Sequence, residues 1–148
     1  MAKRKKPKVK EEPFPQKKPK IASNPLDYYH HHPSWRISKI QVIAPFGWHI
    51  LDKNKLDEIR IKLANFESMT WREMLLESKK QNHTVSVNQI SKIAQAHLRE
   101  IGLDDLEELT SLRLSGTERV WGFIIQGVMN LLWWDPEHKV YPSKKRNT

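Results

Sequence analysis

The chain has 148 residues with 26 Lys or Arg, 17 Asp or Glu and no cysteine, which excludes disulfides, thiolate catalysis and cysteine-bound zinc. This length suits one domain of ordinary size with tails. The net charge of +9 lies at the ends: Met1 to Pro25 holds nine Lys or Arg against two Glu, and Lys139 to Thr148 holds four against none. No apolar run approaches the roughly 18 residues of a membrane span. We therefore expect no membrane partner and a cytoplasmic location.

Residues 1–33 combine Lys and Pro with few apolar side chains. Such a segment buries too little surface to offset its chain entropy, so we expect a disordered basic tail that contacts phosphate or simply keeps the protein in solution. The adjacent His30, His31 and His32 lack the spaced geometry of a metal site, and we expect neither metal nor cofactor. One domain over residues 34–143 and a basic tail over 144–148 would follow.

The domain should begin with a strand, because the run from Trp35 to Ala44 is rich in β-branched residues and stops at Pro45. Apolar side chains then recur at spacings of three and four residues, which predicts a helix from about Lys53 to Glu67. The residues of this stripe are Leu56, Ile59, Leu63 and Phe66.

Two capping-box patterns predict further helices. The box from Thr70 to Glu73 opens a short helix that should run to about Lys79. The box from Ser86 to Gln89 opens a helix that should end at Gly102 and cover the sheet. His97 lies in the apolar stripe of this helix, where we interpret it as a packing residue rather than a catalyst.

The run from Leu112 to Tyr141 reads as three antiparallel strands. Gln126 and Gly127 separate two β-rich segments, which is a hairpin signal. Counting outward from this turn places Trp121 opposite Leu132 and Arg119 opposite Trp134. These residues belong to a face that we expect to be open, because it holds the polar groups. Trp133 belongs to the other face, in the core.

The turn before the second of these strands decides where Arg113 points. A two-residue loop would bury Arg113, which costs several kcal/mol for an unpaired guanidinium. A three-residue loop with Gly116 in the left-handed region instead places Arg113 beside Arg119 on the open face. Two neighbouring arginines repel each other unless an anion lies between them. Either a bound phosphate or a carboxylate of Glu118 or Asp135 could supply that negative charge.

The sequence therefore predicts an α+β fold with an N-terminal strand, two to three helices and a three-stranded antiparallel meander that completes one small sheet packed on the helices. The order of elements, with LRLSG leading into RVWGF and then WWDPEHKVY, resembles the RelE/ParE superfamily of bacterial toxins over about Trp35 to Lys145. A Lys/Pro tail, the capped helix after Thr70 and the run from Trp133 to Pro136 depart from the family pattern.

The resemblance implies a toxin-like endoribonuclease that acts on mRNA, with a ribosome requirement left open, and an antitoxin that covers the same face. It implies that Arg113 and Arg119 bind phosphate and that the C-terminal residues His138, Lys139 and Tyr141 take the acid-base and stacking positions. The hypothesis needs no metal and assigns catalysis to Arg113, Arg119, His138 and Tyr141. Nucleic-acid contacts are assigned to Trp121, Trp134, Lys139, Lys144, Lys145 and Arg146.

Two alternatives stay open at this point. The same cations and indoles could hold single-stranded nucleic acid without chemistry. The chain could also inhibit gyrase or another protein target through an exposed aromatic face, as the superfamily includes gyrase-directed members.

Overall fold

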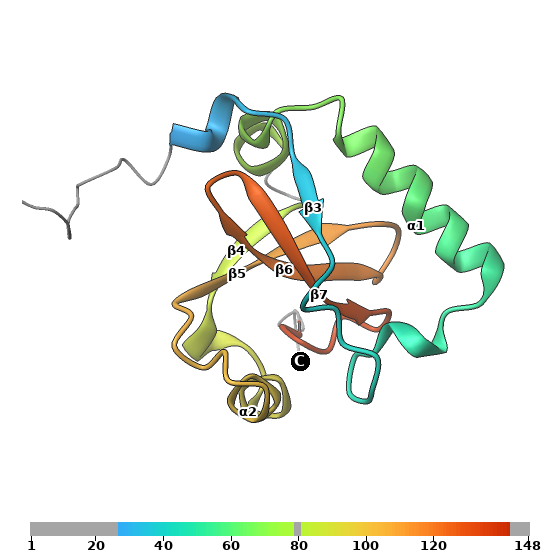
Figure 1. Cartoon of the computed structure of the whole chain (residues 1–148), viewed down its shortest axis with the longest axis vertical. Helices are drawn as coiled ribbons and strands as arrows, with labels where there is room; N and C mark the ends of the chain where they lie inside the picture. Colours follow the sequence, from blue (N-terminus) through green and yellow to red (C-terminus); the bar gives the residue numbers. More distant parts are fainter. Residues whose placement is uncertain (1–26, 79–80, 143–148) are drawn as a thin grey trace, which may run out of the picture.

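Five strands form one mixed sheet at the centre of the molecule (Figure 1). The structure is a computed structural model, and it describes residues 27–78 and 81–142. The strands lie in the order β3-β7-β6-β5-β4. Their bounds are Ser34–Arg36 (β3), His83–Ser86 (β4), Glu108–Arg113 (β5), Arg119–Ile125 (β6) and Val128–Asp135 (β7).

The strands from β4 to β7 pair antiparallel, whereas β3 pairs parallel with β7. The predicted α+β class is confirmed, but the predicted sheet was wrong because it left out β4. In this strand Val85 is buried and its neighbours in the strand are exposed, so the segment carries little apolar signal. The first strand is also shorter than predicted, since it ends at Arg36 and the chain leaves the ladder there.

In the described residues, one short helical segment precedes β3, and two α-helices and three shorter helical segments lie between the strands. They are η1 (Asp27–His30), η2 (Trp48–Ile50), α1 (Lys53–Phe66), the π-helical turn η3 (Glu73–Glu77), η4 (Val87–Gln89) and α2 (Lys92–Glu100). None of the helices in the described ranges is long and apolar enough to cross a membrane. The sequence assigned the segment before β3 to the disordered tail. The last part of this segment instead contains η1, and it packs Tyr28 and Tyr29 against the core.

The N-terminal caps follow sequence rules in part. The Asp52 side chain accepts a hydrogen bond from the Lys55 N–H at 2.8 Å and starts α1. The reciprocal bonds between Thr70 and Glu73 form as predicted, at 2.8 and 3.2 Å. The predicted start of the next helix was wrong, because the side chain that caps α2 belongs to Ser91, which accepts from the Ala94 N–H.

Both faces of the sheet are covered, which corrects the prediction of an open face. One face packs against α1 and η3 through a cluster that includes Ile59, Phe66 and Trp134. The opposite face packs against α2 through a cluster that includes Leu98 and Trp133. Trp133 is fully buried, as predicted, but it lies on the same face as Trp121 and not on the opposite one.

A β-bulge changes the register between β6 and β7. The pairs nearest the turn, Ile125 with Val128 and Phe123 with Asn130, match the prediction. Beyond a shift at Gly122 the register changes, and the pairs become Gly122 with Leu131, Trp121 with Trp133 and Arg119 with Asp135. Leu132 is therefore the extra residue in β7, and the predicted pairs of Trp121 with Leu132 and Arg119 with Trp134 were wrong. A Cβ at Gly122 would collide with the carbonyl oxygen of Asn130.

Candidate functional site

The hairpin between β5 and β6 brings two arginines side by side. Arg113 pairs directly with Arg119 in the ladder. The loop between the strands closes through a bond from the Leu114 N–H to the Glu118 carbonyl oxygen at 3.0 Å, and Gly116 has a φ of 50°. Both the predicted loop and the predicted pairing of the arginines are confirmed. They lie on the α2 side of the sheet, since Leu112 points into the opposite core.

The Arg119 side chain is held by the backbone of its own hairpin. One terminal nitrogen, Nη1, donates to the carbonyl oxygens of Gly116 and Glu118 at 2.8 and 3.1 Å. The Nε atom is buried and has no hydrogen-bond partner in the described chain. Burial and the nearby charge of Arg113 lower the pKa of Arg119, while Asp135 opposes them. Arg119 is therefore a cation that is held in position and whose charge is only partly balanced by its surroundings.

The carboxylates that could neutralise the arginines have other partners. Glu118 binds Lys55 of α1 at 2.7 Å and accepts a bond from the Ser115 hydroxyl at 2.9 Å. No ion pair within 4 Å joins Arg113 or Arg119 to a carboxylate among the described residues. Asp135 lies opposite Arg119 in the ladder and supplies a longer-range attraction.

Asp135 organises the segment that follows the sheet. Asp135 is 1% exposed, and its carboxylate accepts three hydrogen bonds: from the Lys139 N–H at 2.8 Å, the Val140 N–H at 2.9 Å and the Trp121 indole N–H at 3.2 Å. Bonds to a charged acceptor are among the stronger ones in proteins. The chain after Pro136 is therefore folded back on the sheet, with His138 in the left-handed region at a φ of 60°.

This return brings three predicted site residues together. Arg119, His138 and Tyr141 line one depression of about 420 Å³, with β4 and η4 on its other side. Residues of β4 and η4 that line it include His83 and Gln89. Burial is the largest cause that lowers the pKa of His138, followed by the charge of Arg119; His83 and Arg113 act in the same direction. This lowered pKa favours the neutral imidazole, which is the form that accepts a proton.

Three of the remaining predicted contact residues have different surroundings. Trp121 and Trp134 are buried, at 0% and 3% exposure, so the prediction that they stack on nucleic acid was wrong. The sheet faces on which they lie are covered by α2 and α1. Lys139 is exposed and forms an ion pair with Glu137 at 2.8 Å. The predicted contacts of Lys144, Lys145 and Arg146 lie outside the described residues.

His83 and Gln89 were not predicted, because the run HTVS holds a single apolar residue and gives only a weak strand signal. Reading Ser86 as the start of a helix cap hid this signal. His83 pairs with Ser111, which in turn pairs with Trp121, so the β4 histidine shares a face with the two arginines. Within the described ranges, no group of three potential ligand side chains is arranged to hold a metal ion.

Comparisons with protein-family models, with curated proteins and with solved structures find no match to this chain.

Proposed function

We propose that this protein is an endoribonuclease that cleaves single-stranded RNA, with the RNA's own 2′-hydroxyl as the nucleophile. The observation that carries the proposal is the depression in which Arg119, His138 and Tyr141 meet. Arg113 adds a second cation beside Arg119. Two guanidinium groups without an ion-paired carboxylate in the described chain suit one phosphate group, because each can donate two hydrogen bonds to its oxygens.

The proposed reaction is an internal transesterification. The neutral His138 imidazole removes the proton of the 2′-hydroxyl, whose oxygen forms a bond to the phosphorus. The bond from phosphorus to the 5′-oxygen of the next nucleotide breaks, and His83 donates a proton to that oxygen. Arg113 and Arg119 stabilise the negative charge that develops on the other phosphate oxygens. The products are a 2′,3′-cyclic phosphate and a free 5′-hydroxyl.

Tyr141 is the aromatic residue of the predicted set that lines the depression, where it is 38% exposed. A half-exposed phenol ring beside a phosphate site can stack on an unpaired base. The resemblance to RelE/ParE toxins favours mRNA as the substrate and cleavage on the ribosome in the cytoplasm. It also favours an antitoxin as a partner protein. These finer assignments belong to the proposal.

The alternatives have less support. A stacking platform for single-stranded nucleic acid needs exposed rings, and an inhibitor with an aromatic binding face needs them as well. Trp121 and Trp134, on which both alternatives relied, are buried. The cationic depression would still bind phosphate without chemistry, so the test must separate binding from cleavage.

The test uses end-labelled RNA with and without ribosomes, and the same RNA with 2′-deoxy sugars. We expect cleavage of the first, a cyclic phosphate at the new end, and no cleavage of the second. Arg119→Ala and His138→Ala should each lower the rate by roughly 10²-fold or more, while His138→Ala keeps RNA binding. Arg72→Ala is the matched control, because Arg72 is exposed on the α1 side of the sheet, at the start of η3.

The arginines should also act as a unit. The double variant Arg113→Ala, Arg119→Ala should lose little more activity than either single variant, because both groups hold one anion. Full cleavage by the double variant would refute the proposal. RNA binding by the parent protein without cleavage, in the presence and absence of ribosomes, would instead support a binding module.

A further inference from the structure

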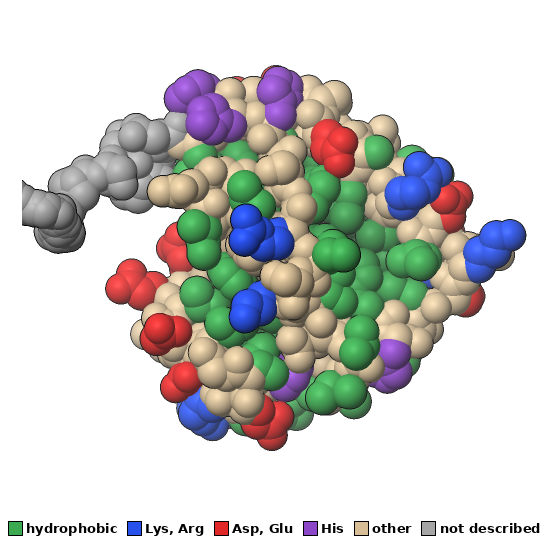
Figure 2. Space-filling view, in the orientation of Figure 1, with side chains coloured by type: hydrophobic (Ala, Val, Ile, Leu, Met, Phe, Trp, Pro, Cys, Tyr) green, Lys and Arg blue, Asp and Glu red, His purple; other side chains and the backbone are tan. Residues whose placement is uncertain are grey.

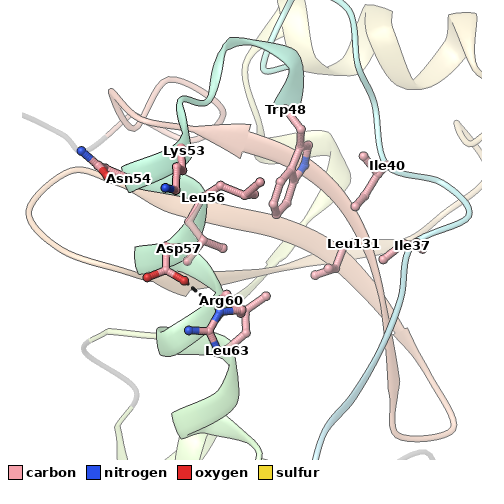
Figure 3. A pocket seen from close by; sticks show the side chains of 11 residues that line it. Ile37, Ile40, Trp48, Lys53, Asn54, Leu56, Asp57, Arg60, Leu63 and Leu131 are labelled. Carbon is pink, nitrogen blue, oxygen red and sulfur yellow. Dashed lines mark hydrogen bonds and ion pairs between the residues drawn. The ribbon is translucent and has the colours of Figure 1, made fainter.

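A second concave surface lies on the opposite side of the sheet from the proposed nuclease site. It is a groove of about 780 Å³ between α1, the chain after β3 and the edge of β7 (Figure 3). We call it the α1 groove. Its apolar lining consists of Ile37, Ile40, Trp48, Leu56, Ile59, Leu63 and Leu131, and its polar lining consists of Lys53, Asn54, Asp57 and Arg60.

The groove exists because α1 uses only part of its apolar stripe. Ile59 and Phe66 are buried against the sheet, at 2% and 6% exposure. Leu56 belongs to the same stripe but is 51% exposed, and Ile37 across the groove is 70% exposed. A stripe at helical spacing normally packs along its whole length. The first turns of α1 therefore carry apolar surface that the described chain does not cover.

Trp48 gives a second observation at the same place. Its ring lines the groove (Figure 3), yet its indole N–H is buried and has no hydrogen-bond acceptor in the described chain. A buried donor without an acceptor costs roughly 1–3 kcal/mol. The region of the groove around Trp48 therefore holds a polar group that the described chain leaves without an acceptor.

The charges around the groove indicate the sign of the ligand's charge. Lys53 lies in the first turn of α1, where the Asp52 carboxylate at the N-cap faces the positive end of the helix dipole, and the first turn itself holds no acidic residue. Lys39 is exposed between Ile37 and Ile40 in the sequence, and neither Lys39 nor Lys53 forms an ion pair with a described carboxylate, whereas Arg60 and Asp57 of the lining pair with each other at 2.9 Å. In the space-filling view, Lys and Arg side chains flank an apolar hollow on both sides (Figure 2).

We propose that the α1 groove binds an acidic amphipathic helix of a partner protein. Apolar side chains at helical spacing would fill the space between Leu56, Ile37 and Leu131, and flanking carboxylates would meet Lys53 and Lys39. The chain's own first 25 residues are a poor occupant, because their nine Lys or Arg repel the same cations. The site is independent of the proposed nuclease chemistry.

The experiment measures fluorescence anisotropy of a labelled peptide of about 15 residues, a length near the minimum for a stable helix. The peptide carries Leu at positions i, i+3, i+4 and i+7 and Glu at the flanking positions. Two further peptides replace every Glu with Lys or scramble the Leu positions. We expect the full-length protein to bind the first peptide saturably and to bind the other two at least about tenfold more weakly.

Variants locate the site. Leu56→Asp should weaken binding at least about tenfold, since it removes the contact of one large apolar side chain. Lys53→Glu should weaken binding of the Glu peptide and strengthen binding of the Lys peptide. Ile125→Asp is the control, because Ile125 is similarly exposed, at 55%, but lies at the β6–β7 turn. Thermal unfolding should change little in all three variants, since these side chains are largely exposed.

Three results would overturn the proposal. Equal binding of the Glu and Lys peptides would remove the argument from charge. Unchanged binding by Leu56→Asp would place the peptide elsewhere. A dimer in light scattering that Leu56→Asp converts to a monomer would show that the occupant is a second copy of this chain.

Discussion

Replacing Asp135 tests whether one buried carboxylate holds the C-terminal segment on the sheet. Asp135→Ala removes the acceptor of three hydrogen bonds, two of them from the backbone of Lys139 and Val140. A hydrogen bond to a charged group contributes roughly 1.5–3 kcal/mol. The two backbone donors regain water if the segment opens, whereas the indole N–H of Trp121 stays buried. We therefore expect a loss of about 3 kcal/mol in the free energy of unfolding.

The assay is urea unfolding followed by tryptophan fluorescence, combined with RNA cleavage under conditions where the variant remains folded. Cleavage should fall together with stability, because His138 and Tyr141 lie on the segment that Asp135 holds. Glu137→Ala is the matched control, since Glu137 is exposed on the same segment and binds only Lys139 among the ion pairs of the described residues. It should leave unfolding unchanged.

Asp135→Asn separates the hydrogen bonds from the charge. The amide keeps one acceptor oxygen, so its loss of stability should be smaller than that of the Ala variant. The Asp135 charge raises the pKa of His138 against the larger lowering causes, so its removal should move the acid limb of the pH profile of kcat/KM to lower pH. A loss below about 1 kcal/mol for Asp135→Ala would refute this account of the segment.

Three further predictions concern the hairpin and the histidines. Gly116→Val should destabilise the protein by roughly 1 kcal/mol or more in urea unfolding, because Gly116 has a positive φ; unchanged stability would contradict the strain argument. Arg119→Ala should move the acid limb of the residual cleavage toward the ordinary histidine pKa of about 6.5, since Arg119 lowers the pKa of His138; a shift to lower pH would contradict this. Burial lowers the pKa of His97. The contribution of neutral His97 to the free energy of unfolding should therefore be complete above about pH 6.5, and it should be lost as the pH falls through the lowered pKa. His97→Gln should make stability depend less steeply on pH, and its side chain should still accept the Trp133 indole hydrogen bond, which is 3.0 Å long in the parent protein. An equally steep pH dependence in the variant would show that another group takes up the protons.

The hairpin of β5 and β6 could be predicted from sequence because one strong energetic term decides it. Burying Arg113 without a partner is costly, and the alternative loop needs a residue at positive φ, which Gly116 supplies. The helix α1 was predictable for a similar reason, since its apolar spacing fits a single period. In both cases local chemistry and tertiary structure favour the same conformation.

The covered sheet was not predictable in the same way. Counting from the turn at Gly127 assumes an uninterrupted ladder, and the extra residue Leu132 breaks that count. The bulge moves Trp134 to the opposite face from the one assigned to it and brings Asp135 opposite Arg119. At the bulge the backbones of Gly122 and Asn130 approach so closely that a side chain at Gly122 would clash, a contact between strands that no single strand reveals.

The candidate site was found only in part for a related reason. Arg119, His138 and Tyr141 stand in one stretch of sequence, and the resemblance had already grouped them. His83 comes from β4, a strand separated from this stretch by β5 and α2, and the exposed polar residues of β4 resemble a loop. His83 and His138 line the same depression only because β4 pairs with β5 and because the chain folds back after Pro136.

The position of β7 bears on how the protein is made. The last strand of the sheet lies between β3 and β6, and its contact with β3 joins Ser34 to Val128 across most of the chain. Such non-local pairing slows folding, because the long loop must close before its contacts contribute. The sheet also cannot form on the ribosome until β7 has left the exit tunnel. The residues that gather around Asp135 are therefore assembled only after β7 has emerged, whereas β4, β5 and β6 can already pair with one another before then.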